Sequence, residues 1–171
     1  MHKFLLCLTF LFVSACATPK KTVLLGGGGG CDVPPAPSKP WEPHMCTIPT
    51  IEFECPTVGY RVDTNCMHQC RSDYMAECEA AYALCNSLYD ICLSGFNIAT
   101  LLCSTEYEID IAAGVPPEQA QEICEMCMDW ELDRMVDQVM QINGVLQIML
   151  EAANLKYEAC VESCCVRVRF P

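Results

Sequence analysis

The sequence predicts a mainly α-helical fold: a long antiparallel helical hairpin, or a small helical bundle, stapled by several disulfides. Three observations predict it. The chain has 16 cysteines in 171 residues. Two long segments carry apolar residues at spacings of three and four, which is the period of an amphipathic helix. A stretch rich in glycine and proline precedes both segments and is unsuited to a helix.

The first element is a leader over residues 1–15. It has Lys3 in a short polar start, an apolar run from Phe4 to Val13, and small residues before Cys16. The run is too short to span a bilayer as a helix, so we interpret it as a signal peptide. Val13-Ser14-Ala15-Cys16 resembles the lipobox of bacterial lipoproteins. This resemblance implies cleavage before Cys16, lipidation of its thiol, and anchoring in the bacterial outer membrane or cell surface. The alternative is cleavage after Ala17, which would give a secreted soluble protein.

The second element, residues 16–60, is predicted to be a lipid-anchored tether and strap. It contains Gly26 to Gly30 and eight prolines, a composition that gives a flexible or extended chain. Because Cys31, Cys46 and Cys55 lie in it, we expect part of it to run back along the first helix. Residues 61–171 are the predicted disulfide-rich hairpin domain.

The first predicted helix begins near Asp63, with Asp63 or Thr64 as its N-cap. Its apolar residues form one continuous stripe: Cys66, Cys70, Tyr74, Cys78, Ala81, Cys85, Leu88, Cys92, Phe96 and Ala99.

The second predicted helix enters through Pro116-Pro117-Glu118, because proline fits the first helical turn and an acid there suits the helix dipole. Its stripe continues to about Cys160 through Leu132, Met135, Val136, Val139, Ile142, Leu146, Met149, Leu150 and Ala153. Gly114-Val115-Pro116-Pro117 is the strongest turn signal between the two helices.

The cysteine positions predict a register for the hairpin. In antiparallel helices, the numbers of residues at one level add to a constant. Three pairs add to 230: Cys66–Cys164, Cys70–Cys160 and Cys103–Cys127. Half of this sum is 115, which falls in the predicted turn. We therefore predict these three pairs as disulfides.

A short two-stranded ribbon is predicted between residues 51–55 and 165–170, which both alternate with period two. It would set Glu52 and Glu54 against Arg167 and Arg169 and would bring Cys55 near Cys165, giving a fourth pair. The remaining candidates have unassigned partners: Cys31, Cys46, Cys78, Cys85, Cys92 and Cys124. Cys7 and Cys16 are set aside, so 16 − 2 = 14 cysteines remain for bridges.

The twin CxxxC motifs, Cys66 to Cys70 and Cys160 to Cys164, resemble those of helical-hairpin proteins of the mitochondrial intermembrane space. The likeness covers those four cysteines only. It implies bridges across antiparallel helices and is used as an analogy of geometry, without the family's chaperone activity.

The sequence gives no indication of an enzyme, since it has no nucleophile elbow, phosphate-binding loop or HExxH helix. The functional alternative is Cu(I) or Zn binding or storage in the envelope. Its candidate ligands are Cys124, Cys127, Met126, Met128 and His68, because thiolate and thioether sulfurs are soft ligands. The cysteine-lined helix, with Cys66, Cys70, Cys78, Cys85 and Cys92, is also somewhat similar to bacterial copper-storage bundles. Export disfavours free thiols, so we expect structural disulfides and no cofactor.

The net charge of −12 disfavours nucleic acid and anionic membrane surfaces as partners of the folded part. We expect a structural or protein-interaction module of the cell envelope, with basic proteins as plausible clients. Two helices rarely hide a full apolar stripe, so residues Trp130, Leu132, Leu146 and Leu150 are the predicted surface for another envelope protein or a second copy.

Overall fold

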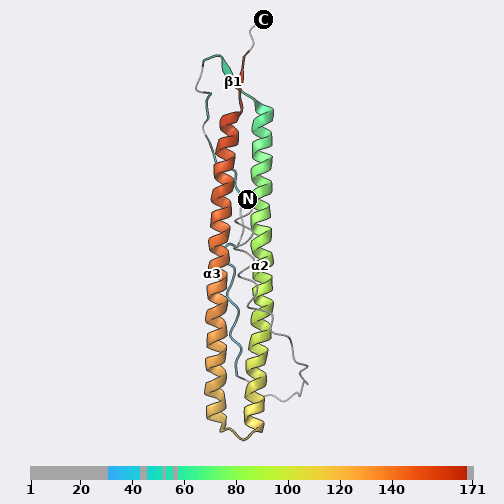
Figure 1. The fold of residues 1–171 in the computed structure, drawn as a ribbon, viewed down its shortest axis with the longest axis vertical. Helices are drawn as coiled ribbons and strands as arrows, with labels where there is room; N and C mark the ends of the chain where they lie inside the picture. Colours follow the sequence, from blue (N-terminus) through green and yellow to red (C-terminus); the bar gives the residue numbers. More distant parts are fainter. Residues whose placement is uncertain (1–30, 43–45, 52, 56–57, 169–171) are drawn as a thin grey trace, which may run out of the picture. The chain divides into compact units, whose positions relative to one another are not determined.

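The computed structural model describes residues 31–42, 46–51, 53–55 and 58–168. The predicted signal peptide, Cys16 and the glycine run lie outside these residues. Within them, the order of elements is β1 (Tyr60–Val62), α2 (Thr64–Ala112), α3 (Pro117–Ser163) and β2 (Cys165–Arg167). The two helices run antiparallel (Figure 1), so the predicted mainly helical, disulfide-stapled hairpin is confirmed.

Helix α2 is capped at its start by Asp63. The Asp63 carboxylate accepts hydrogen bonds from the backbone N–H groups of Asn65 (2.9 Å) and Cys66 (3.4 Å). These N–H groups have no partner within the helix, so the cap stabilises its first turn. Of the two predicted N-caps, the structure selects Asp63.

The turn between the helices lies at the predicted position. Gly114 has φ +87°, and its N–H donates to Ile111 O, while the N–H of Val115 donates to Asp110 O. This pair of bonds is a Schellman motif, which ends a helix with a residue in the left-handed region. Glycine adopts that region without steric cost. Pro117 then begins α3, with Glu118 in its first turn.

The described chain divides into two compact units, and both helices contribute to each. We call residues 34–96 and 130–168 the strap unit, and residues 31–33 and 97–129 the turn unit, in both cases meaning their described residues. We call the described residues between 31 and 55 the extended segment. The strap unit holds this segment except for residues 31–33, together with the two strands. The turn unit holds the connection between α2 and α3.

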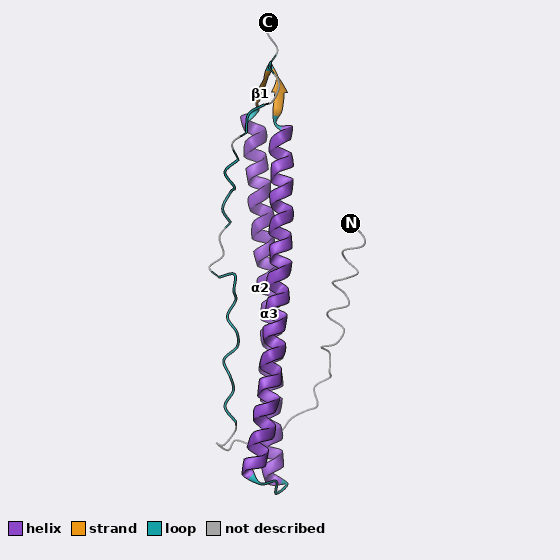
Figure 2. Ribbon diagram, turned by 90° about the vertical axis from the view of Figure 1, so that its left-hand side faces the viewer, coloured by secondary structure: helices purple, strands orange, loops and turns teal. Residues whose placement is uncertain are grey.

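The strap unit has two apolar clusters. In one, Trp41 from the extended segment packs with residues of α2 and α3, including Cys85, Phe96, Met135 and Leu146. Trp41 donates its indole N–H to Asn86 Oδ1 (3.0 Å), and Tyr89 donates its hydroxyl to Pro37 O (2.7 Å). The extended segment is therefore a third packed layer along the helices of this unit, as Figure 2 shows.

The second cluster of the strap unit lies nearer the strands. Its buried members are Cys70, Tyr74, Ala153, Tyr157, Val161 and Cys164, and Ile51 and Phe53 of the extended segment pack against them. Most of the two predicted helical stripes thus forms the interior, and the extended segment covers it, whereas Val136 of the second stripe is exposed.

The two-stranded ribbon has a different first strand from the predicted one. β2 pairs antiparallel with β1, with Val62 opposite Cys165, and residues 51, 53, 54 and 55 are not in a strand. β1 leads directly into α2 and β2 directly follows α3, so the ends of the paired helices bring these two segments together. The N–H of Asp63 donates to Cys164 O (2.8 Å) at that junction. Glu52 and Arg169 lie outside the described residues.

The turn unit has a small interior in which most of the buried side chains contain sulfur. Its cluster consists of Cys31, Cys103, Cys124 and Met128, with Tyr107 and Cys127 packed against it. Ala120 and Thr100 are also buried there.

Candidate functional site: disulfide framework and exposed surfaces

Three disulfides join α2 directly to α3. They are Cys66–Cys164, Cys70–Cys160 and Cys103–Cys127, with Cα–Cα distances of 5.5, 5.8 and 5.9 Å. These are the partners that the register predicts. The distances lie in the ordinary range for disulfides, so the helices need no displacement to be bridged.

Three further disulfides hold the extended segment. Cys55 is bonded to Cys165, as predicted, although the ribbon strand expected to bring them together is absent at residues 53–55. The partners that the sequence left open are now assigned: Cys31 bonds Cys124 in the turn unit, and Cys46 bonds Cys78 in the strap unit.

Cys85 and Cys92 form no disulfide with any described cysteine, which corrects the expectation that each belongs to a pair. They lie on α2, and α3 carries no cysteine between Met128 and Ala159, while the three cysteines of the extended segment are bonded elsewhere. Cys85 is fully buried, with Sγ 3.8 Å from Ile142 O. Burial raises the pKa of both thiols, and Arg134 partly opposes this for Cys92.

The two bridges of the twin CxxxC motifs touch each other. Cys70 Sγ lies 3.5 Å from Cys164 Sγ, although each is bonded to a different cysteine. The sulfurs of Cys66, Cys70 and Cys164 all lie within 4.8 Å of one another. As disulfides these atoms are not thiolates, and only reduction would make them metal ligands.

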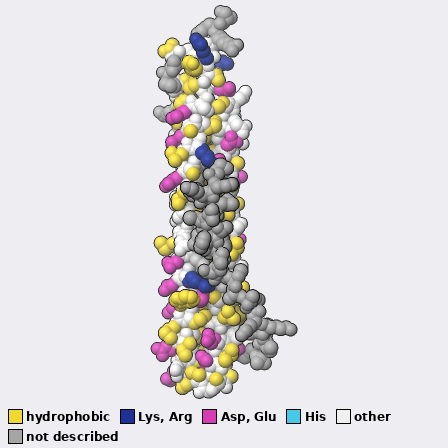
Figure 3. All heavy atoms as spheres, viewed as in Figure 1, with side chains coloured by type: hydrophobic (Ala, Val, Ile, Leu, Met, Phe, Trp, Pro, Cys, Tyr) yellow, Lys and Arg dark blue, Asp and Glu magenta, His cyan; other side chains and the backbone are white. Residues whose placement is uncertain are grey.

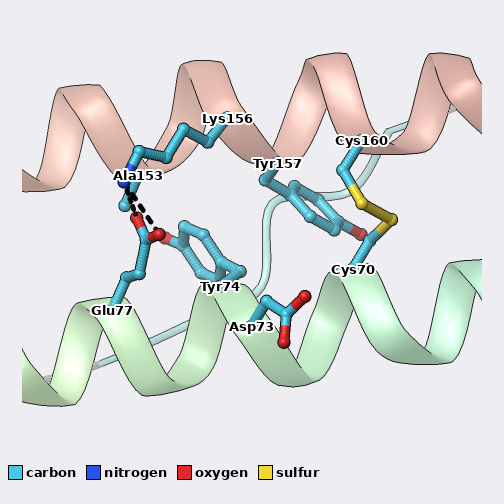
Figure 4. Close-up of a pocket in the computed structure, with 8 residues that line it drawn as sticks. All are labelled: Cys70, Asp73, Tyr74, Glu77, Ala153, Lys156, Tyr157 and Cys160. Atoms are coloured by element: carbon cyan, nitrogen blue, oxygen red, sulfur yellow. Dashed lines mark hydrogen bonds and ion pairs between the residues drawn. A yellow bond between two sulfur atoms is a disulfide. The ribbon is translucent and has the colours of Figure 1, made fainter.

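A cavity of about 140 Å³ lies beside the Cys70–Cys160 bridge in the strap unit. Figure 4 shows Tyr74 and Tyr157 among the residues that line it, together with the Lys156–Glu77 ion pair. The Lys156 Nζ lies 2.8 Å from Glu77 Oε1, and the rings of Tyr74 and Tyr157 are 5.3 Å apart. The carboxylate and the ammonium are paired with each other, and Asp73, which also lines the cavity, accepts a hydrogen bond from Gln69 Nε2 (2.7 Å).

The predicted interaction surface is only partly on the surface. Trp130 is 64% exposed, with the Arg134 guanidinium 5.6 Å from its ring centroid. Leu146 is buried in the core, and Leu132 and Leu150 are half-buried against it. The expectation is therefore wrong for Leu146, because the hairpin and the strap together close over this part of the stripe.

The predicted metal ligands are also dispersed. Cys124 and Cys127 belong to two different disulfides. Met128 is buried, Met126 is 60% exposed, and His68 is exposed in the other unit. The CxxC pair therefore has no free thiol to offer, which contradicts its role as a thiolate site in this oxidised chain.

One exposed apolar surface, in the turn unit, was missed by the sequence analysis. Every leucine and isoleucine of the described turn unit is exposed: Ile98, Leu101, Leu102, Ile109, Ile111 and Ile123. A signal existed, because residues 91–105 contain no charged residue. Mean hydropathy also makes α2 the one described helix long and apolar enough to cross a membrane by length and composition.

Comparison with known proteins identified no relative of this chain. The sequence matches no protein-family model, and no curated protein or solved structure is significantly similar to it.

Proposed function

We propose that this chain is a non-enzymatic lipoprotein of the bacterial envelope that acts as a structural or protein-interaction module. In this proposal the chain is exported, cleaved before Cys16 and anchored through a lipid on that cysteine, and the hairpin presents surfaces to other envelope proteins.

The disulfides support the exported location. Twelve cysteines form six bridges among the described residues. Disulfides persist in oxidising compartments and are rare in the cytosol. A narrow helical pair buries little apolar surface, so covalent bridges are the ordinary means of stabilising it.

The observation that carries the interaction role is the outward placement of aliphatic side chains. In the turn unit, Ile98 and Ile109 are each 62% exposed, whereas the interior contains cysteines and Met128. A sizeable apolar patch on a disulfide-held scaffold is typical of a surface that binds another protein.

The proposal is tested on protein purified from the envelope of a bacterial host. We expect labelled fatty acid to be incorporated into the wild type and not into Cys16→Ala. We also expect the soluble part to bind a hydrophobic dye or to co-purify with a partner. A chain that takes up no lipid, and that light scattering shows as a strict monomer with no dye binding, would contradict the proposal.

The alternative function is Cu(I) or Zn binding by reduced cysteines. The observation that favours it is the close group of Cys66, Cys70 and Cys164 sulfurs. Thiol titration separates the two functions. A scaffold gives two free thiols per exported chain, whereas a metal protein gives many thiols and stoichiometric Cu(I) uptake.

A further inference from the structure

We infer that the outer face of α2 in the turn unit is a docking surface for a cationic amphipathic helix of a partner protein. This inference rests on the proposed interaction role and adds the place and the chemistry of the partner. We call the surface the α2 stripe and define it as Ile98, Leu101, Leu102, Thr105 and Ile109.

The stripe is continuous on one side of the helix. Ile98, Leu102, Thr105 and Ile109 follow the spacing i, i+4, i+7, i+11, which keeps side chains on one face, and Leu101 lies beside them. Its four aliphatic members are 55% to 62% exposed. A second helix with its own apolar stripe fits such a face by interlocking side chains along its length.

The stripe has no polar group that requires water. Thr105 donates its hydroxyl to Leu101 O (2.8 Å), and the neighbouring Ser104 donates to Thr100 O (3.2 Å). Both donors are therefore satisfied within α2. A partner that covers this face does not leave them unpaired, so the desolvation cost of docking stays small.

Carboxylates flank the stripe on both sides. On a helix of 3.6 residues per turn, Glu106 and Glu108 lie about 80° to either side of Ile98. The described turn unit contains no lysine, arginine or histidine. Its acidic residues are Asp32, Glu106, Glu108, Asp110, Glu118, Glu122, Glu125 and Asp129. Figure 3 shows apolar and acidic side chains together at the end that carries the α2–α3 turn.

This charge pattern selects the partner. A second copy would bring two sets of carboxylates together with no cation of the turn unit to neutralise them, and an anionic bilayer would be repelled in the same way. A helix with leucine-like side chains on one face and lysine or arginine on both borders matches the apolar stripe and its acidic borders at once.

The test uses the full chain and a synthetic amphipathic helix of leucine and lysine, about 16 residues long to match the turn-unit part of α2, with fluorescence anisotropy as readout. We expect binding that weakens with added salt, and no binding of the same peptide with glutamate in place of lysine. The double variant Ile98→Ser/Leu102→Ser should weaken binding about tenfold or more, because two apolar anchors are lost. Glu106→Gln/Glu108→Gln should weaken it several-fold.

The matched control is Met140→Ser/Ile148→Ser on α3. These side chains are 68% and 59% exposed but belong to the strap unit. The control should bind the peptide as the wild type does. An equal loss of peptide affinity in the control and in Ile98→Ser/Leu102→Ser overturns the inference. It is also overturned if the wild type dimerises or binds lipid vesicles and Ile98→Ser/Leu102→Ser abolishes that association. A chain that binds hydrophobic dye but not the peptide overturns the α2 stripe and leaves the proposed function standing. Failure of dye binding, partner capture and peptide binding together overturns both.

Discussion

At the scale of single residues, the two unpaired cysteines differ in accessibility. Cys85 is 0% exposed in the core of the strap unit, while Cys92 is half-buried. Burial disfavours the thiolate, so both thiols stay protonated at neutral pH and act as small apolar side chains. Their unpaired state follows from the positions of the other described cysteines, all of which are bonded to one another.

A thiol reagent should reveal this difference. In the native protein without reductant we expect Cys92 to react first and Cys85 only at the rate of opening of the core. The Cys92→Ser variant should lose the faster phase and keep the slower one. Two fast phases in the wild type would show that Cys85 is not buried.

Stability should also depend on these thiols at high pH. Their folded pKa values are raised above 9.0, so the folded chain keeps the two protons when the unfolded chain loses them. This contribution to the free energy of unfolding is therefore fully present below pH 9 and is lost as the pH rises through the raised values. Denaturant unfolding at several pH values should show the decline, and Cys85→Ala/Cys92→Ala should reduce its slope. The same slope in the double variant would assign the decline to other groups.

At the scale of elements, the extended strap completes the apolar core of its unit. Trp41 is 6% exposed, packs edge-on to Tyr89 with ring centroids 6.2 Å apart, and bonds Asn86. A segment without helix or strand thus adds a large aromatic side chain to the core formed by α2 and α3.

Replacing Trp41 with alanine should lower the free energy of unfolding by about 3–5 kcal/mol, because a large buried side chain and its hydrogen bond are lost. The matched control is Trp130→Ala, since Trp130 is 64% exposed and its loss should cost less than about 1 kcal/mol. Chemical denaturation followed by circular dichroism measures both. Similar costs for the two variants would mean that the strap does not pack as described.

The elements also show how far sequence reasoning reaches. Helix periodicity predicted α2, α3 and the turn. The three bridges between the helices followed because the residue numbers of level positions in an antiparallel hairpin add to a constant. The prediction that residues 51–55 pair with β2 was wrong, since an apolar–polar alternation of period two is equally typical of an extended segment that forms no strand. Cys31–Cys124 and Cys46–Cys78 lay beyond prediction because an extended segment has no fixed rise along a helix. Leu146 was wrongly predicted to be on the interaction surface for a related reason, because helix periodicity does not show which apolar residues the extended segment covers.

At the scale of the whole molecule, the two units are stabilised by different means. The strap unit buries Trp41, Phe96, Met135 and Leu146 in one apolar cluster, and it has four disulfides. The turn unit has two disulfides, and its aliphatic side chains face outward. The order of the turn unit therefore depends more heavily on its bridges.

Removing one bridge from each unit tests this contrast. The Cys103–Cys127 and Cys46–Cys78 bridges have sequence separations of 24 and 32, so the chain-entropy model gives each a similar contribution of about 3–4 kcal/mol. We expect Cys103→Ser/Cys127→Ser to raise amide hydrogen exchange strongly over residues 97–129. Cys46→Ser/Cys78→Ser should change exchange less in its own unit, where packing remains. A larger increase in exchange in the Cys46→Ser/Cys78→Ser variant would show that disulfides are not the main source of stability in the turn unit.

The pattern of bridges also determines how the chain withstands a protease. A nick anywhere between Cys31 and Cys46, or in the connection from Ala112 to Pro117, leaves fragments still joined through bonds such as Cys31–Cys124 and Cys103–Cys127. Cleaved protein should therefore migrate as one band on a non-reducing gel and separate only after reduction. Cleavage of one of these connections would therefore leave the molecule in one covalently joined piece.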